Sequence, residues 1–211
     1  ATYDRKDIGT PVLRNSAYLL ATDGGTSAVY HKMHLVPFGE YVPLRKVLFF
    51  AHKIVYGDVD FQAGTGPVVM QVRLPTGQEV AVGTVICYEI IFPGLVRRFV
   101  DEGATVITTI TNDAWFGRTA APYQHFSMAV FRAVENRRPV VRAANTGISA
   151  FILPNGKIME QSDLFTQALL TKEIPLADSG LTLYTRYGDK IHDAQLARLN
   201  AALVLTLKGT P

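Results

Sequence analysis

The chain has 211 residues, of which 48% are hydrophobic and 18% are charged. This length and apolar content are typical of one globular domain with a sizeable core, and they exclude a disordered chain. Twenty-one basic and 18 acidic residues leave a net charge of only +3, and the basic residues are scattered along the chain. We therefore expect no nucleic-acid-binding surface.

The sequence shows no membrane span and no leader. The longest apolar stretch, 199–207, is interrupted by polar residues and is shorter than the roughly 18 residues that a spanning helix needs. The chain starts Ala-Thr-Tyr-Asp, without an initiator methionine, so we expect the natural start to lie upstream. Its single cysteine, Cys87, excludes an internal disulfide and a cysteine-based zinc cluster.

The first predicted elements are a hairpin and a helix. Segments 17–22 and 26–30 are rich in strand-forming residues and flank Asp23-Gly24-Gly25, and an Asp-Gly pair favours a tight hairpin turn. Apolar residues recur at helical spacing between positions 44 and 55. That spacing predicts a short amphipathic helix.

The middle of the chain alternates between strand and helix patterns. Two β-rich runs, 67–74 and 79–87, are separated by a Pro-Thr-Gly turn, and the second is nearly continuous in Val, Ala and Ile. We expect it to be buried on both faces. A helix over 93–101 begins with proline and is closed by Gly103, before another buried strand at 104–110. This is a β-α-β unit of an α/β fold.

The same alternation continues toward the C-terminus. A loop at 112–117 precedes a helix that begins at Pro122, and strands are predicted at 139–144, 149–153 and 157–161. The helix is expected to bury one apolar face, formed by Phe126, Ala129, Val130, Ala133 and Val134.

Cys87 stands at the carboxyl end of a predicted buried strand and before a turn. In open α/β sheets, ligands bind beyond the carboxyl ends of the strands, so a substrate can reach this position. The thiolate is the nucleophilic form of cysteine, and a neighbouring cation favours it. Lys32 is the candidate cation. The alternative is that Cys87 is a small buried hydrophobic residue.

Charged residues also stand in apolar surroundings. Glu89 follows the buried strand, and an ionised carboxylate withdrawn from water costs several kcal/mol unless it is paired. Lys32, His34 and Glu40 lie close together in sequence, among Leu, Val, Pro, Phe and Tyr residues. We expect these charges to be held in an apolar site. A solvated strand end and an ordinary surface loop are the alternatives.

Three stretches carry a family resemblance. Residues 30–43 read Tyr-His-Lys-Met-His-Leu-Val-Pro-Phe-Gly-Glu-Tyr-Val-Pro, residues 86–89 read Ile-Cys-Tyr-Glu, and residues 111–117 read Thr-Asn-Asp-Ala-Trp-Phe-Gly. Together they closely resemble the nitrilase-like domain of the apolipoprotein N-acyltransferases. The Lys-x-His-Leu part alone marks only the wider carbon-nitrogen hydrolase superfamily, whereas the rest is more specific. The resemblance covers about residues 15–189.

The resemblance implies a four-layer α-β-β-α sandwich and a Glu-Lys-Cys catalytic set. Cys87 would attack a phospholipid ester to form a thioester, and the acyl chain would then pass to the N-terminal amine of a diacylglyceryl-cysteine lipoprotein, with ping-pong kinetics. The Lys32 ammonium and the backbone N–H of Tyr88 would stabilise the oxyanion. Glu40 and Glu89 match family positions that support the site.

Further site residues follow from the same resemblance. Tyr88, Phe38, Asn112, Trp115 and Phe116 are expected to bind substrate, although Trp115 and Phe116 could equally belong to the core. No cofactor and no metal are expected, because the His31 and His34 pair has no nearby carboxylate or cysteine ligand. His125 is expected to have no functional role.

The chain departs from the family pattern at its beginning. Family members carry the general-base Glu before the lysine loop, yet no Glu precedes Glu40 in this sequence. We therefore expect 1–189 to be an N-terminally incomplete domain that is inactive alone, and 190–211 to be a tail that could lead toward a membrane segment. The resemblance also implies membrane helices before the domain and a place on the periplasmic side of the bacterial inner membrane. That Glu40 replaces the base is the alternative.

Two other functions stay open from the sequence. A soluble amidase of the same superfamily would hydrolyse a small amide through the same thioester chemistry. A non-catalytic binding remnant would leave Cys87 an ordinary thiol.

Overall fold

The computed structural model describes residues 2–4, 12–43, 61–176 and 180–190. Within them, the main sheet has six strands in the spatial order β10-β9-β8-β7-β6-β5. The strands are β5 (Val69–Arg73), β6 (Glu79–Ile86), β7 (Val106–Asn112), β8 (Val140–Asn145), β9 (Ala150–Ile152) and β10 (Ile158–Gln161). β6, β7 and β8 run parallel, and the outer pairs are antiparallel.

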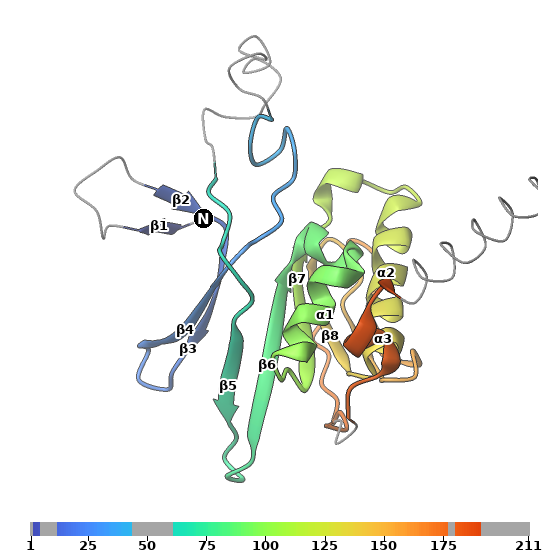
Figure 1. The fold of residues 1–211 in the computed structure, drawn as a ribbon. Helices are drawn as coiled ribbons and strands as arrows, with labels where there is room; N and C mark the ends of the chain where they lie inside the picture. The colour runs from blue at the N-terminus through green and yellow to red at the C-terminus, as the bar shows by residue number, and fades with distance from the viewer. Residues whose placement is uncertain (1, 5–11, 44–60, 177–179, 191–211) are drawn as a thin grey trace, which may run out of the picture.

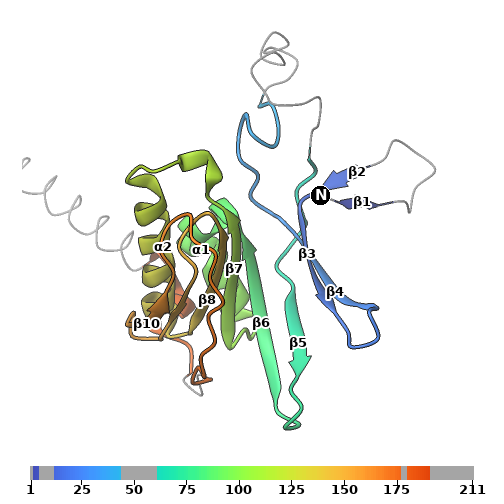
Figure 2. The same ribbon diagram turned by 180° about the vertical axis from the view of Figure 1, so that it is seen from behind.

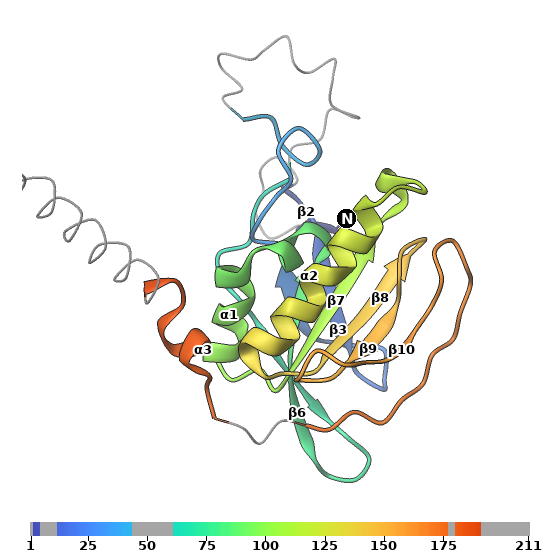
Figure 3. The same cartoon turned by 90° about the vertical axis from the view of Figure 1, so that its right-hand side faces the viewer.

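Helices cover one side of this sheet and a hairpin lies on the other (Figures 1 and 2). Figure 3 looks onto the helical side, where α1 and α2 cross in front of the strands. The helices are α1 (Pro93–Asp101), α2 (Ala121–Asn136) and α3 (Leu183–Tyr187), with short 3₁₀ turns η2 (Cys87–Ile91) and η3 (Ala114–Phe116). The hairpin is β3 (Ser16–Leu20) with β4 (Thr26–His31), and β1 (Thr2–Asp4) pairs with β2 (Val12–Arg14).

The predicted α/β alternation is confirmed. The hairpin, the β6-α1-β7 unit and the strands after α2 all form where the sequence indicates, with ends shifted by one or two residues. The strand predicted at 79–87 is fully buried only over 83–86, since Glu79 is exposed and Ala81 and Val82 are half-buried. Val134 was expected on the buried face of α2 and is 47% exposed, so that assignment was wrong. The predicted helix at 44–55 and the tail beyond residue 190 lie outside the described residues.

The parallel strands bring three chain segments together at their carboxyl ends, on one end of the sheet. Ile86 of β6 pairs with Ile110 of β7, and Asn112 at the end of β7 pairs with Asn145 at the end of β8. Cys87 directly follows β6, so it lies at the same end of the sheet as the two asparagines. No helix in the described part of the chain has the length and apolar character needed to cross a bilayer.

A close approach between α1 and β6 fixes the helix on the sheet. A Cβ added at Gly83 would lie 2.9 Å from the Cβ of Phe99 and 3.1 Å from that of Ala104. We expect Gly83→Ala to lower the free energy of unfolding by about 1–3 kcal/mol through overpacking. Gly94→Ala in α1 is the matched control, because its added methyl meets no atom within 4 Å. Chemical denaturation of both variants tests this, and equal stabilities would contradict it.

Candidate active site

Cys87 occupies the sharp turn where β6 ends and η2 begins. Its φ of 52° lies in the left-handed region, which is uncommon for a residue with a side chain. Such conformations persist only where the surrounding structure enforces them, and they cluster at functional sites. The thiol is partly exposed and packs against the hydrophobic core. The predicted placement at the end of a buried strand is confirmed.

Glu89 joins this turn to the segment that carries Lys32. The side chain is fully buried, and its Oε1 accepts hydrogen bonds from the Tyr30 hydroxyl at 2.8 Å, the Met33 N–H at 2.7 Å and the His34 N–H at 3.0 Å. Oε2 accepts from the Ile86 N–H at 2.8 Å.

Burial raises the pKa of the Glu89 carboxyl, and the hydrogen bonds from the His34 and Ile86 N–H groups oppose this rise. The burial of Tyr30, together with the neighbouring Glu89 charge, raises the pKa of the Tyr30 hydroxyl. The expected partner of Glu89 is therefore a set of donors rather than a cation.

Lys32 and Glu40 form an ion pair in the same region. The Lys32 side chain is 2% exposed, and its Nζ lies 2.7 Å from Glu40 Oε2. Glu40 Oε2 also accepts from the Val36 N–H at 2.8 Å, and Oε1 accepts from Asn15 Nδ2 at 2.8 Å. Both carboxylate oxygens are thus engaged in orienting Lys32 and its loop. This favours a supporting role for Glu40 over a role as general base.

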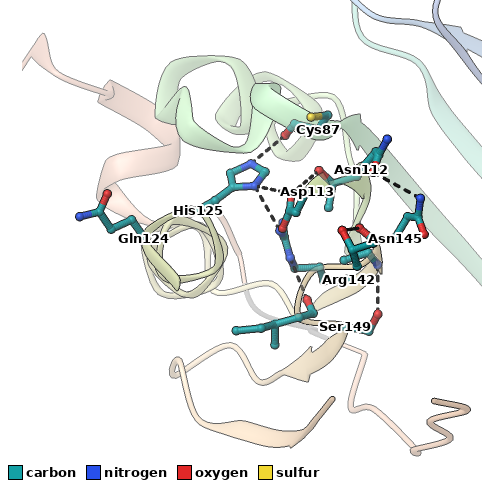
Figure 4. A network of polar contacts seen from close by, with 12 residues as sticks. Cys87, Asn112, Asp113, Gln124, His125, Arg142, Asn145 and Ser149 are labelled. Carbon is teal, nitrogen blue, oxygen red and sulfur yellow. Dashed lines mark hydrogen bonds and ion pairs between the residues drawn. The ribbon is translucent and has the colours of Figure 1, made fainter. Parts of the chain in front are cut away.

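A second polar network lies beneath the Cys87 turn (Figure 4). Asp113 is 1% exposed and accepts from Arg142 Nη2 at 2.7 Å and from the Thr111 hydroxyl at 2.9 Å. His125 of α2 lies between Asp113 and Cys87, with Nδ1 3.0 Å from Asp113 Oδ1 and Nε2 3.2 Å from the Cys87 carbonyl oxygen. His125 was expected to be an ordinary histidine, and the structure places its ring against the Cys87 turn.

The sequence contained signals for this network. Arg142 is a charged residue inside an apolar strand, as unusual as Glu89 after β6. His125 falls on the buried face of α2, beside Phe126 and one turn before Ala129. What the sequence could not indicate is that the two residues meet Asp113 from different elements.

The remaining predicted substrate residues differ in exposure and in their contacts. Asn112 Oδ1 accepts from Asn145 Nδ2 at 3.3 Å, and both side chains are near the sheet edge (Figure 4). Trp115 is 76% exposed, which excludes the alternative that it belongs to the core. The Phe116 ring packs edge-on against His125, with 5.8 Å between centroids. Phe38 is also exposed, and its φ is positive in the lysine loop.

Aromatic rings surround the residue that follows Cys87. The Tyr88 ring packs edge-on against Phe92 with centroids 5.3 Å apart, and the His34 ring lies 3.8 Å from that of Phe92. The His34 ring is thus in an aromatic cluster. Within the described residues, no group of three or more His, Cys, Asp or Glu side chains is arranged to hold a metal ion.

The Asp113 network gives a pH-dependent stability. Burial alone would raise the pKa of the Asp113 carboxyl, but the His125 hydrogen bond and the Arg142 charge lower it below the ordinary value of 3.8. A depressed folded-state pKa contributes stability that is present above about pH 3.8 and is lost as the pH falls through the folded value.

We therefore expect the unfolding free energy of the wild type to fall more steeply than that of Asp113→Asn on acidification below pH 4. The slope difference approaches about 1.4 kcal/mol per pH unit. Urea titrations between pH 3 and pH 5 measure it, and parallel curves for the two proteins would be inconsistent with the network.

The sequence and the fold of the chain are similar to those of known proteins. A family model described as carbon-nitrogen hydrolase matches residues 2–184. The chain belongs to the carbon-nitrogen hydrolase family. The carbon-nitrogen hydrolase from Helicobacter pylori G27 superposes with a TM-score of 0.56 over 76% of this chain and 56% of that protein, at 16% identity. This confirms the predicted nitrilase-like fold.

Similar sequences bear a more specific name. The chain is 48% identical over 193 residues to the apolipoprotein N-acyltransferase of Geobacter metallireducens. The matched region covers 92% of this chain and 36% of that protein. It is 37% identical over 180 residues to the apolipoprotein N-acyltransferase of Chlorobaculum tepidum, at 84% and 34% coverage. The chain thus spans about a third of the length of these relatives.

Proposed function

We propose that the protein of this chain is an acyltransferase. It moves a fatty acyl chain from a phospholipid to the N-terminal amine of a diacylglyceryl-cysteine lipoprotein through a thioester on Cys87. The observation that carries the proposal is the Glu89 carboxylate, which holds the Lys32 segment against the Cys87 turn through hydrogen bonds to Met33 and His34. The names of the relatives favour the lipid substrates over a small amide.

The first half-reaction forms the thioester. The Cys87 sulfur attacks the ester carbonyl, the Lys32 ammonium and the Tyr88 N–H stabilise the oxyanion, and the lysophospholipid leaves with the proton that the thiol gave up. The 2.7 Å ion pair between Lys32 Nζ and Glu40 Oε2 would let Glu40 orient the ammonium toward this position. Phe38, Trp115, Phe116 and Asn112 are assigned to the substrate-facing surface.

The second half-reaction releases the acyl chain. The deprotonated lipoprotein amine attacks the thioester, an amide forms, and the sulfur regains a proton as it leaves. Both steps need a proton acceptor, and neither Glu40 nor Glu89 has an oxygen free of donors. We assign this base to a glutamate outside the chain, following the family pattern, and we expect 1–189 alone to be inactive.

The proposal includes a cellular setting. Membrane helices outside the chain would hold this domain at the periplasmic side of the bacterial inner membrane, where phospholipid and lipoprotein are both available. Residues 190–211 would be a tail that leads toward a membrane segment. The function needs no cofactor, because cysteine acyl transfer proceeds with protein groups alone.

A transfer assay separates the acyltransferase from the amidase. The complete natural protein in detergent is given phospholipid and a synthetic diacylglyceryl-cysteine peptide, and mass spectrometry follows the N-acyl peptide and the lysophospholipid. We expect both products to form in equal amounts. Release of ammonia from short amides, without acyl transfer, would instead establish the amidase.

Removing the ammonium should impair the first half-reaction. We expect Lys32→Met to lower the rate of lysophospholipid release by about 10²–10³-fold, because an oxyanion donor is lost. Lys157→Met, at an exposed position just before β10, is the control and should leave the rate unchanged. A rate for Lys32→Met within threefold of the wild type would remove Lys32 from the mechanism.

A further inference from the structure

The Cys87 carbonyl has a partner that defines a histidine tautomer. A carbonyl oxygen can only accept, so the His125 Nε2 that lies 3.2 Å from it must carry a proton and donate. On the other side of the ring, Nδ1 lies 3.0 Å from Asp113 Oδ1 and 3.2 Å from Arg142 Nη2. In the neutral ring Nδ1 accepts from Arg142, and in the imidazolium it donates to Asp113. Nε2 keeps its proton in both states.

The ring is held by groups from separate elements. Asp113 follows β7, Arg142 belongs to β8, and His125 belongs to α2, and all three are buried. Arg142 Nε also donates to the Ile148 carbonyl at 3.0 Å. Gly147 leaves the room that Asp113 needs, because a Cβ there would overlap the Asp113 carboxylate. His125 therefore has little freedom to move away from the Cys87 carbonyl.

We infer that His125 is a positioning residue, which holds the Cys87 peptide in its left-handed turn by donating Nε2–H to the Cys87 carbonyl, with the Asp113–Arg142 pair fixing the ring. The left-handed φ of 52° carries an energetic cost that this bond offsets. Rotation of this peptide group away from His125 would turn the Tyr88 N–H, which belongs to the same peptide group, and would release the Cys87 backbone that carries the sulfur. The expected effect on catalysis rests on the proposed function. The hydrogen bond between His125 and the Cys87 carbonyl does not depend on it.

The electrostatics of the site agree with this geometry. Burial lowers the pKa of the Arg142 guanidinium, and the negative charges of Asp113 and of a Cys87 thiolate oppose that change. Arg142 thus lies within electrostatic reach of the sulfur. The network links the nucleophile to the sheet by charge as well as by a hydrogen bond.

Two amide replacements of His125, which differ in length, test the bond. The side-chain amide nitrogen of His125→Gln can take the place of Nε2 and donate to the Cys87 carbonyl. His125→Asn is shorter, so it keeps a polar contact with Asp113 but cannot reach Cys87. The two variants are compared in the complete natural protein by kcat and KM for acyl transfer, by the rate of Cys87 alkylation with iodoacetamide, and by thermal unfolding.

We expect His125→Asn to lower kcat by about 10–100-fold with KM changed less than threefold, and to slow alkylation at least fivefold. His125→Gln should stay within about threefold of the wild type in each rate. Equal losses in both variants, or unchanged rates in His125→Asn with only a lower Tm, would overturn the inference. If the wild type transfers no acyl chain, the proposed function fails, and the alkylation rates still decide whether His125 positions Cys87.

Discussion

Replacing Cys87 by alanine is expected to lower acyl transfer by about 10⁴-fold or more, since the variant has no sulfur to form the thioester. What remains would come from oriented donors and substrate binding, as in other enzymes that have lost a nucleophile. The measurement is the initial rate of N-acyl peptide formation in the complete natural protein. A residual rate within tenfold of the wild type would show that another group takes the acyl chain.

This loss should be separable from unfolding. Cys87 is only partly buried, and alanine can occupy the same turn, so the free energy of unfolding should change by about 1 kcal/mol or less. Cys87→Ser is the companion variant, because it keeps the size of the side chain and a weaker nucleophile. If Cys87→Ala unfolded the protein, the transfer rate of a folded Cys87→Ser protein would show whether the thiol is needed for activity.

Replacing Glu89 by leucine is expected to have the largest effect on stability. Four donors, from Tyr30, Met33, His34 and Ile86, would lose their acceptor inside the protein. Removing one side of a buried, fully hydrogen-bonded charge typically costs about 3–5 kcal/mol. Acyl transfer should also be lost, because the Lys32 segment would no longer be tied to the Cys87 turn. Chemical denaturation and the transfer assay measure the two effects.

Two further substitutions separate charge from shape at this position. Glu89→Gln keeps an acceptor for the Oε1 donors but places an amide N–H against the Ile86 N–H, so a smaller cost of about 1–3 kcal/mol is expected. Glu79→Gln, at the exposed start of β6, should change stability by less than about 0.5 kcal/mol. A Glu89→Leu protein as stable as Glu79→Gln would contradict the described hydrogen bonds.

The fold could be predicted from the sequence where local patterns decide it. The Asp-Gly turn of the β3–β4 hairpin, the proline that begins α1 and the apolar run of β6 each determine structure through nearby residues. Cys87 and Glu89 were found because a nucleophile and a carboxylate after a buried strand need a reason to be there. The roles assigned to them stay predictions until they are tested by substitution.

The remainder of the site depends on contacts that no local pattern encodes. His125 meets the Cys87 carbonyl across 38 positions of sequence, and only the packing of α2 against η2 brings them together. Trp115 was ambiguous because aromatic residues occur both in cores and at binding surfaces, and only its exposure decides against the core. The domain boundary near residue 189 likewise stays a prediction.

Trapping the acyl enzyme tests the central claim most directly. The complete natural protein is incubated with phospholipid and no acceptor peptide, then digested, and the Cys87 peptide is weighed by mass spectrometry before and after treatment with hydroxylamine. We predict an added fatty acyl mass on Cys87 that hydroxylamine removes and that the acceptor peptide discharges. Acyl transfer that proceeds while the Cys87 peptide stays unmodified would contradict the account.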